Sequence, residues 1–389
     1  MSKTDMPWDE WVPGALSYRQ IQELINEDLF NQHDEFKGEL DHSSIDLTLS
    51  SECYELPHGS VKPFGSRYLN RVKRMGLAVK YKPDKEGIFL LKQRNTYLFK
   101  LQERIPLLRS TCIYGQATAK STVGRMDVLA RLIVDGMQTY EEFLPAEIGN
   151  GDMYIEITPM TFNVRVKQGI SLNQIRLFKG TPQDCEIRST AIYNTVITNT
   201  ESTDGSLSLD TSTVTIEKSK VSVFRTVEMK PESPAIDLWQ KHHADPHLYW
   251  EFVEGNKHKR IEIAPTRFHI MRSYERIAVP KGIAVYCRAS DETIGEMRIH
   301  YAGFAHPYFG YKNGENAQSK PEPVGTPLVF EVRGHDVKVS LMHREKMARL
   351  IFYRMSEDAN LESKPIKDDD AYQHQSLQLS KCFKNWSEK

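Results

Sequence analysis

One short segment of the chain concentrates side chains that bind phosphate. Lys120, Ser121, Thr122 and Arg125 lie within six positions, with Gly124 among them. Hydroxyl groups donate hydrogen bonds to phosphate oxygens, and lysine and arginine neutralise their charge. The segment therefore predicts a site for a polyanionic phosphate tail. A turn hydroxyl for Ser121 and a surface ion pair for Arg125 are the ordinary alternatives.

A glutamate in a strand-like segment follows about 30 residues later. Met153–Ile157 alternates in polarity and carries Glu156. One carboxyl group in a sheltered pocket can activate a water molecule and then deliver the proton to a leaving group. A glutamate in a strand more often faces solvent, but the upstream phosphate-binding segment favours catalysis. We therefore expect Glu156 to be the general base, assisted by Ser121 and Arg125.

A second, altered copy of these segments follows in the same order. Four pairs of segments match: Ile45–Leu47 with Ile236–Leu238, Glu103–Ile105 with Glu275–Ile277, Thr122–Met126 with Thr293–Met297, and Tyr154–Ile157 with Val329–Val332. Each match is weak alone, but four collinear matches predict a duplicated fold.

The two copies differ where a phosphate would bind. Glu296 stands at the position of Arg125, and Arg349 stands at the position of Gln174. A glutamate reverses the local field, so a triphosphate would be repelled there. Both copies keep the strand glutamate. We expect one intact site, in the first copy, and a supporting second copy.

Short β-type segments dominate the elements that must position these residues. The alternating segments are 44–49, 153–157, 162–166 and 221–224. One helix is expected near the start, where Ser17 and Gln20 form a capping box. Residues 195–215, rich in Thr, Ser and Asp, predict a connecting region, with an exposed hairpin as the alternative. The expected domains are 1–194 and 216–389.

Bulk composition excludes several classes of protein. The net charge of −1 lacks the basic surplus that nucleic-acid or anionic-membrane binding requires. No segment approaches the ~20 apolar residues of a transmembrane helix. The first residues show no signal peptide, and the five cysteines are scattered. A cytoplasmic location is expected.

Several of these segments resemble the dCTP deaminase branch of the dUTPase-like superfamily, in its fused two-domain form. Residues 16–21 resemble the family's first helix, Lys120–Arg125 its nucleotide-binding signature, and Gly151–Glu156 the strand that carries the catalytic glutamate. Gly169–Gln174 resembles the next turn and strand. Tyr372–Gln375 and Ser380–Lys381 resemble a tail that closes over the nucleotide.

The resemblance implies two tandem β-barrel domains of the β-clip type, related to a distorted jelly roll, with few helices. It implies hydrolysis of dCTP to dUTP and ammonia, which supplies dUTP for dTMP synthesis. It further implies a threefold homo-oligomer, feedback inhibition by dTTP, and Mg²⁺ bound with the triphosphate. The residues that it implies for substrate binding are Lys120, Ser121, Thr122, Arg125, Gln174, Tyr372 and Gln375.

The sequence departs from the family pattern at two places. Ala371 stands where a lysine usually precedes the tail tyrosine, and 135–150 lacks the Asp-Pro-Gly-Trp turn. The second copy has a closer version at His306–Gly310. We therefore expect a composite site, in which the first copy supplies the phosphate-binding residues and the base, and another copy supplies the turn that faces the sugar.

Two alternatives remain open. A bifunctional enzyme would also release pyrophosphate from dUTP, and a non-catalytic sensor would only bind nucleotides. Zinc deamination requires a P-C-x-x-C signature, which the chain lacks. His242, His243 and His247 have no second ligand set, so we interpret them as a packed loop.

Overall fold

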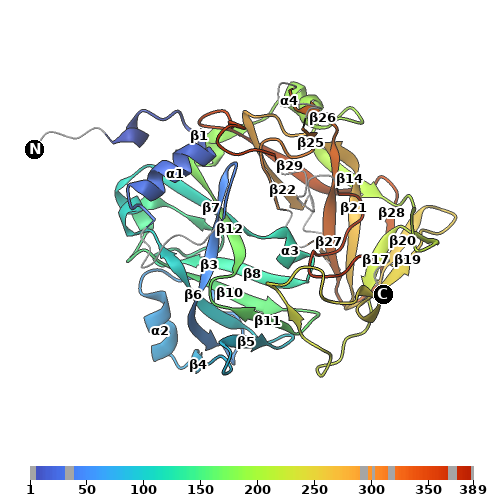
Figure 1. The fold of residues 1–389 in the computed structure, drawn as a ribbon, viewed down its shortest axis with the longest axis horizontal. Coiled ribbons are helices and arrows are strands. Elements are labelled where there is room, and N and C mark those ends of the chain that lie inside the picture. The colour runs from blue at the N-terminus through green and yellow to red at the C-terminus, as the bar shows by residue number, and fades with distance from the viewer. Residues whose placement is uncertain are drawn as a thin grey trace, which may run out of the picture.

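The computed structural model describes residues 6–30, 39–289, 297–299, 303–313, 320–366 and 375–386. Two large sheets, one from each half of the chain, lie side by side (Figure 1). Within these ranges the α-helices are short: α1 (Tyr18–Asn26), α2 (Tyr68–Arg74), α3 (Ser121–Gly124) and α4 (Thr190–Val196). The expected mainly-β fold with two tandem barrel-like domains is confirmed. None of the helices in the described ranges has the length and apolar character to cross a bilayer.

The first sheet contains the segments that carry the predicted phosphate-binding residues. Its strands follow the order β8 (Val128–Val134), β10 (Asp152–Pro159), β6 (Tyr97–Arg104), β3 (Ser44–Glu55), β12 (Ser171–Lys179), β7 (Ile113–Ala119) and β9 (Glu142–Phe143). The expected strands at 44–49 and 153–157 therefore lie within β3 and β10. That at 162–166 overlaps β11 (Val164–Lys167), which belongs to a small separate sheet.

The second sheet repeats this arrangement. Its strands follow the order β19 (Trp250–Val253), β17 (Val223–Thr226), β21 (Phe268–Ile277), β14 (Ser206–Asp210), β29 (Lys346–Arg354), β22 (Ile283–Ala289) and β24 (Phe304–Ala305). β27 (Thr326–Gly334) pairs with β21 and β23 (Met297–Ile299), as β10 pairs with β6 and β8. The matched glutamates, Glu156 and Glu331, thus occupy equivalent strands.

A buried hydrogen-bonded pair supports the duplication at atomic detail. In the first copy, the Glu103 carboxylate accepts hydrogen bonds from the backbone N and the hydroxyl of Thr48, at 2.8 and 2.5 Å. In the second, Glu275 accepts the same two bonds from Ser208, at 2.5 and 2.7 Å. The predicted match between Glu103–Ile105 and Glu275–Ile277 is therefore confirmed.

One of the four matches is wrong. Ile236 and Asp237 form β18, which pairs in parallel with β11 of the first copy. The partner of β3 in the repeat is β14, because β14 lies between β21 and β29 as β3 lies between β6 and β12. Gly205–Leu207 thus takes the place that we expected for Ile236–Leu238, because Ser208 is equivalent to Thr48.

The expected connecting region at 195–215 also needs correction, because β14 is a central strand of the second sheet. The second copy starts earlier. β13 (Glu186–Ile187) pairs with β29 as β1 (Gly14–Ala15) pairs with β12, and α4 follows β13 as α1 follows β1. The change from first to second copy therefore precedes Glu186.

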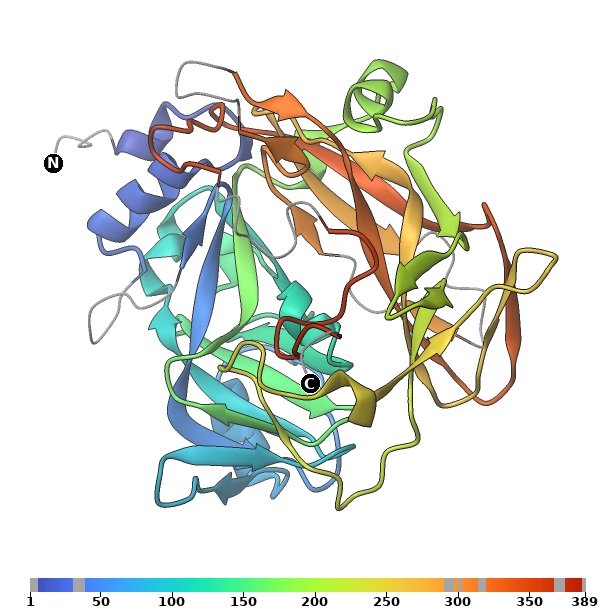
Figure 2. The ribbon, with the colours of Figure 1, turned by 45° about the vertical axis from the view of Figure 1, so that its right-hand side comes forward.

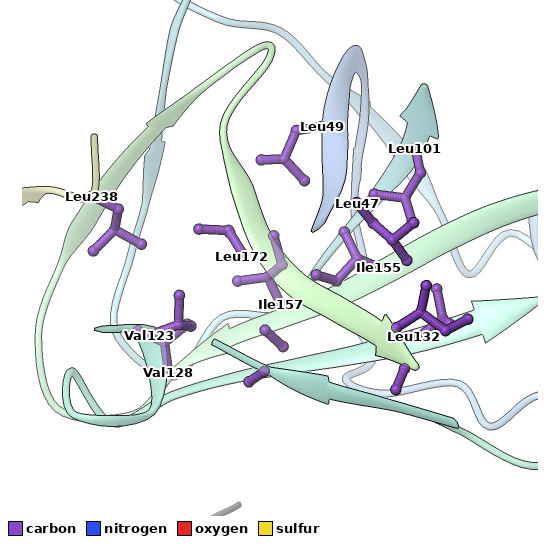
Figure 3. Close-up of a cluster of buried hydrophobic side chains, with 14 of the residues drawn as sticks. Leu47, Leu49, Leu101, Val123, Val128, Leu132, Ile155, Ile157, Leu172 and Leu238 are labelled. Atoms are coloured by element: carbon purple, nitrogen blue, oxygen red, sulfur yellow. The ribbon is translucent and has the colours of Figure 1, made fainter. Parts of the chain in front are cut away.

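The helix that we expected near Ser17 is confirmed as α1, and its local sequence explains where it starts. The Ser17 hydroxyl accepts from the Gln20 backbone N, and the Gln20 side chain accepts from the Ser17 backbone N, which completes the predicted capping box. Ile21 and Leu24 lie on the buried face of the helix. The helix therefore packs against the core of the first sheet, part of which Figure 3 shows.

Candidate active site

The phosphate-binding segment forms a single helical turn at the edge of the first sheet. β7 ends at Ala119, the Lys120 backbone N donates to Leu172 O at 3.0 Å, and α3 follows. Val123 anchors this turn, because its side chain is buried in the core (Figure 3). Asp127 has a left-handed backbone conformation, with φ of 51°, and turns the chain into β8. The polar side chains of α3 therefore project from a fixed backbone.

α3 faces the second copy of the fold, and lies between the two sheets near β27 (Figure 1). A Cβ atom added to Gly124 would lie 2.1 Å from the Glu331 Oε2 atom, so only glycine permits this approach. A Cβ atom added to Gly303 would lie 3.7 Å from the Ser121 hydroxyl. Residues of the second copy thus lie close to α3 of the first copy at both Gly124 and Ser121.

Glu331 is the most unusual group at this contact. Its side chain is buried, with the residue 4% exposed, and Oε2 makes no hydrogen bond among the described residues. Burial raises the pKa of Glu331 to about 8; the Arg125 charge opposes this shift and the Asp127 charge adds to it. Buried polar atoms normally have partners. A buried carboxyl group without one, next to an arginine, is typical of a site that receives a polar ligand.

The C-terminal tail covers the same turn (Figure 2). Arg125 donates hydrogen bonds to the Gln378 carbonyl at 3.1 Å and to the Gln375 side-chain oxygen. The Gln375 amide donates to Pro327 O at 3.1 Å, and the Ser380 hydroxyl donates to Thr122 O at 2.9 Å. The structure therefore brings Arg125, Thr122 and Gln375 together, as predicted. Tyr372 lies outside the described residues.

Glu156 lies in a different environment from these residues. Its carboxylate forms an ion pair with Arg131 and accepts hydrogen bonds from the Val61 backbone N at 3.1 Å and the Tyr140 hydroxyl at 3.2 Å. The Arg131 guanidinium also lies over the Tyr140 ring, 4.2 Å from its centroid. Three partners thus saturate the Glu156 carboxylate, and none of them belongs to α3 or the tail. The structure does not bring Glu156 together with Ser121 and Arg125.

Lys120 and Gln174 form a second polar cluster beside α3. The Lys120 ammonium pairs with Asp46, which lies opposite Gln174 in the β3–β12 register. The Gln174 side chain accepts a hydrogen bond from the Ser44 hydroxyl at 3.3 Å. Lys120 also lines a cavity of about 270 Å³ with Lys241 and Lys381. A ligand in this cavity would therefore compete with Asp46 for the Lys120 ammonium.

Two protein-family models together match almost the whole chain. The 2'-deoxycytidine 5'-triphosphate deaminase N-terminal domain matches residues 12–181, and the C-terminal domain of the same family matches residues 183–383. The chain belongs to the dCTP deaminase family. The two dCTP deaminase matches meet just before β13, where the structure also changes from the first copy to the second.

A solved structure supports the same assignment. The chain is similar to the crystal structure of 2'-deoxycytidine 5'-triphosphate deaminase from Agrobacterium tumefaciens, with a TM-score of 0.74 and 26% sequence identity. The alignment covers 90% of this chain and 99% of that structure's chain. A comparison with curated proteins finds no significant match.

Sequence reasoning missed the role of Glu331, although it noted that both copies keep the strand glutamate. The segment that contains Glu331 was matched to that of Glu156. The sequence does not indicate that Gly124 of the first copy contacts Glu331 of the second, because the two residues are about 200 positions apart. The available signal was the combination of a glycine in the phosphate-binding turn and a duplicated acidic strand.

Proposed function

We propose that the chain deaminates dCTP to dUTP at the contact between α3 of the first copy and β27 of the second. The observation that carries this proposal is the buried Glu331 carboxyl group, packed against Gly124 and beside Arg125. The domain matches supply the substrate and the reaction. In this arrangement the base comes from the second copy, whereas the sequence favoured Glu156 of the first copy.

The environment of Glu331 suits both proton transfers of this reaction. With a pKa near 8 the carboxyl group is protonated at neutral pH, and it can donate that proton to cytosine N3. The carboxylate so formed accepts a proton from the water that attacks C4, and delivers it to the leaving amino group. As the C4–N bond breaks and the C4 hydroxyl becomes the carbonyl, the carboxylate takes the hydroxyl proton, which restores the starting acid. The balance is dCTP plus water to dUTP plus ammonia. This hydrolytic step uses groups of the protein and requires no zinc.

The phosphates would be held by the residues around α3. Arg125 supplies a fixed positive charge, and the hydroxyls of Ser121 and Thr122 supply hydrogen-bond donors. We extend the substrate-binding assignment to Lys120, Gln174, Gln375 and Tyr372, as the sequence predicts. Mg²⁺ would be bound with the triphosphate, as the family resemblance implies. Oligomerisation, dTTP inhibition and cytoplasmic location stay predictions.

Paired substitutions of the two strand glutamates test the proposal. We expect E331Q to reduce kcat for dCTP by at least about 10³-fold while nucleotide binding persists, because loss of a proton-transfer group costs roughly this much. E156Q is the matched control, and should keep most of the activity if the protein folds. Ammonia and nucleotide products should be followed separately.

The products also separate the remaining alternatives. Ammonia with dUTP supports a deaminase, whereas dUMP with pyrophosphate would show a bifunctional enzyme. Nucleotide binding without turnover by the unmodified protein would support a sensor. Full activity of E331Q together with an inactive E156Q would return the base to the first copy.

A further inference from the structure

A buried ion pair joins the two copies next to the Glu331 contact. The Asp127 carboxylate of the first copy pairs with the Arg333 guanidinium of the second copy. The Thr161 hydroxyl donates to the same Asp127 oxygen at 2.5 Å and accepts from Arg333 at 3.0 Å. Asp127 is fully buried and Arg333 is 8% exposed. These three side chains, which we call the Asp127 cluster, form one connected network.

The Asp127 cluster connects the two segments that meet at the proposed active site. Asp127 follows Arg125 by two residues, in the turn that leaves α3. Arg333 follows Glu331 by two residues on β27, so the two side chains share one face of the strand. A shift of β27 relative to α3 would therefore break the Asp127 cluster and move Glu331 away from Gly124.

The energetics of buried ion pairs indicates that the Asp127 cluster aligns β27 with α3. A buried ion pair is weak evidence for stability, since apolar residues of similar volume often stabilise a fold as well or better. Its best-established use is to fix how two segments align. Here the alignment decides where a proton-transfer group lies, and displacements of about 1 Å can cost 10²-fold in rate.

We propose that Asp127, Arg333 and Thr161 are positioning residues, which hold Glu331 of the second copy in register against α3 and Arg125 of the first copy. This inference rests on the proposed role of Glu331. None of the three side chains needs to contact the substrate. The cluster acts through the strand that carries Glu331.

Three variants of the holoprotein test this inference: D127N, T161V and, as a matched control, D237N. Asp237 also forms an ion pair between the copies, with Arg165, and its carboxylate otherwise accepts a hydrogen bond from Gln240. We expect D127N and T161V to lower kcat for dCTP by about 10- to 100-fold with KM changed less than about threefold. D237N should retain the parent kcat and KM.

The pH profile of kcat/KM separates positioning from general damage. The charged groups that act on Glu331 are Arg125 and Asp127 of the first copy. Arg333 lies two residues further along the same strand. Because the negative charge of Asp127 raises the pKa of Glu331, D127N should move the corresponding limb of the profile to lower pH. T161V keeps the charge and should leave that limb in place while kcat falls.

The outcomes distinguish this inference from the proposed function. If E331Q retains full activity, both are overturned. If E331Q is inactive but D127N and T161V keep the parent kcat and pH profile, only the positioning role is overturned. If D127N does not fold, T161V decides, because it removes one hydroxyl group from a side chain of the same shape. A loss of activity in D237N equal to that in T161V would also overturn the positioning role.

Discussion

The burial of the Glu331 carboxyl group, which we propose as the proton-transfer group, carries a cost to the folded protein. It is buried without a hydrogen bond to Oε2 within the described ranges, and its charged form is disfavoured there. Arg125 offsets part of that penalty, but the Arg125 amino groups are also engaged by the tail. In the proposed function, the ring and phosphates of the bound substrate would supply partners for these groups.

The stability of the protein should reflect this penalty in a pH-dependent way. The Glu331 pKa rises from 4.5 to about 8 on folding, so the folded state holds the proton more tightly than the unfolded state. Ionisation of Glu331 therefore leaves the free energy of unfolding unchanged below about pH 4.5. The free energy of unfolding falls as the pH rises from 4.5 to 8, and it is lowest above pH 8. Glutamine cannot ionise and removes this dependence.

We expect E331Q to be inactive and yet more resistant to urea than the parent at pH 8.5, with a smaller difference at pH 7 and the smallest at pH 5.5. Urea unfolding at the three pH values measures this. E262Q is the control, because Glu262 is partly exposed and pairs with Lys338. A difference between E331Q and the parent that stays constant over this pH range would contradict the account.

At the scale of elements, the tail is held by more than its contacts with Arg125. The Phe383 ring lies within 5.6 to 6.3 Å of the rings of Phe162, Tyr249 and Trp250. The backbone of 381–384 is hydrogen-bonded to 242–244, for example from His242 N to Lys381 O at 2.9 Å. The histidine-rich segment is thus a packed loop that binds the tail.

Removing the Phe383 side chain, which anchors the tail, should weaken substrate binding. F383A deletes a buried aromatic side chain, which costs about 3–5 kcal/mol of packing, and much of this cost falls on tail docking. We expect KM for dCTP to rise on the order of tenfold, because Arg125 loses its tail partners, and the tail to become more sensitive to limited proteolysis. L248A is the control, because Leu248 precedes Tyr249 in the chain and its side chain is 62% exposed. An unchanged KM and an unchanged cleavage pattern in F383A would show that the anchor does not support the site.

Elements whose signals are local could be predicted from the sequence. α1 has a complete capping box, and β10 has clear alternation. β14 was missed because serine and aspartate dominate its surroundings, although Leu207 and Leu209 alternate and are fully buried. The α3 turn was found, but its pairing with Glu331 depends on how two copies dock. That arrangement has no signature within either segment.

The whole molecule depends on a central contact between the two sheets. Arg176 of β12 is fully buried and donates hydrogen bonds to Val285 O at 3.0 Å and Ala305 O at 3.3 Å, both in the second copy. Its guanidinium lies 4.1 Å from the centroid of the Phe304 ring. Burial lowers the pKa of Arg176 to about 9. One side chain of the first copy thus satisfies backbone groups of the second.

We expect R176M to destabilise the protein by about 2–5 kcal/mol, because two buried carbonyl groups lose their donor and each costs about 1–3 kcal/mol. Thermal unfolding measures the effect. R276M provides the comparison, since the Arg276 side chain is exposed. Equal melting temperatures for R176M and the parent would show that other contacts dominate the docking of the copies.

The contact between Gly124 and Glu331 has a consequence for how the two halves depend on each other. In the proposed function one half supplies Arg125 for the phosphates and the other supplies the Glu331 carboxyl group, while Glu296 stands at the second copy's position for the arginine. Neither half then holds both groups of this site. The covalent link between the halves therefore delivers the two groups together, in equal number, in every chain.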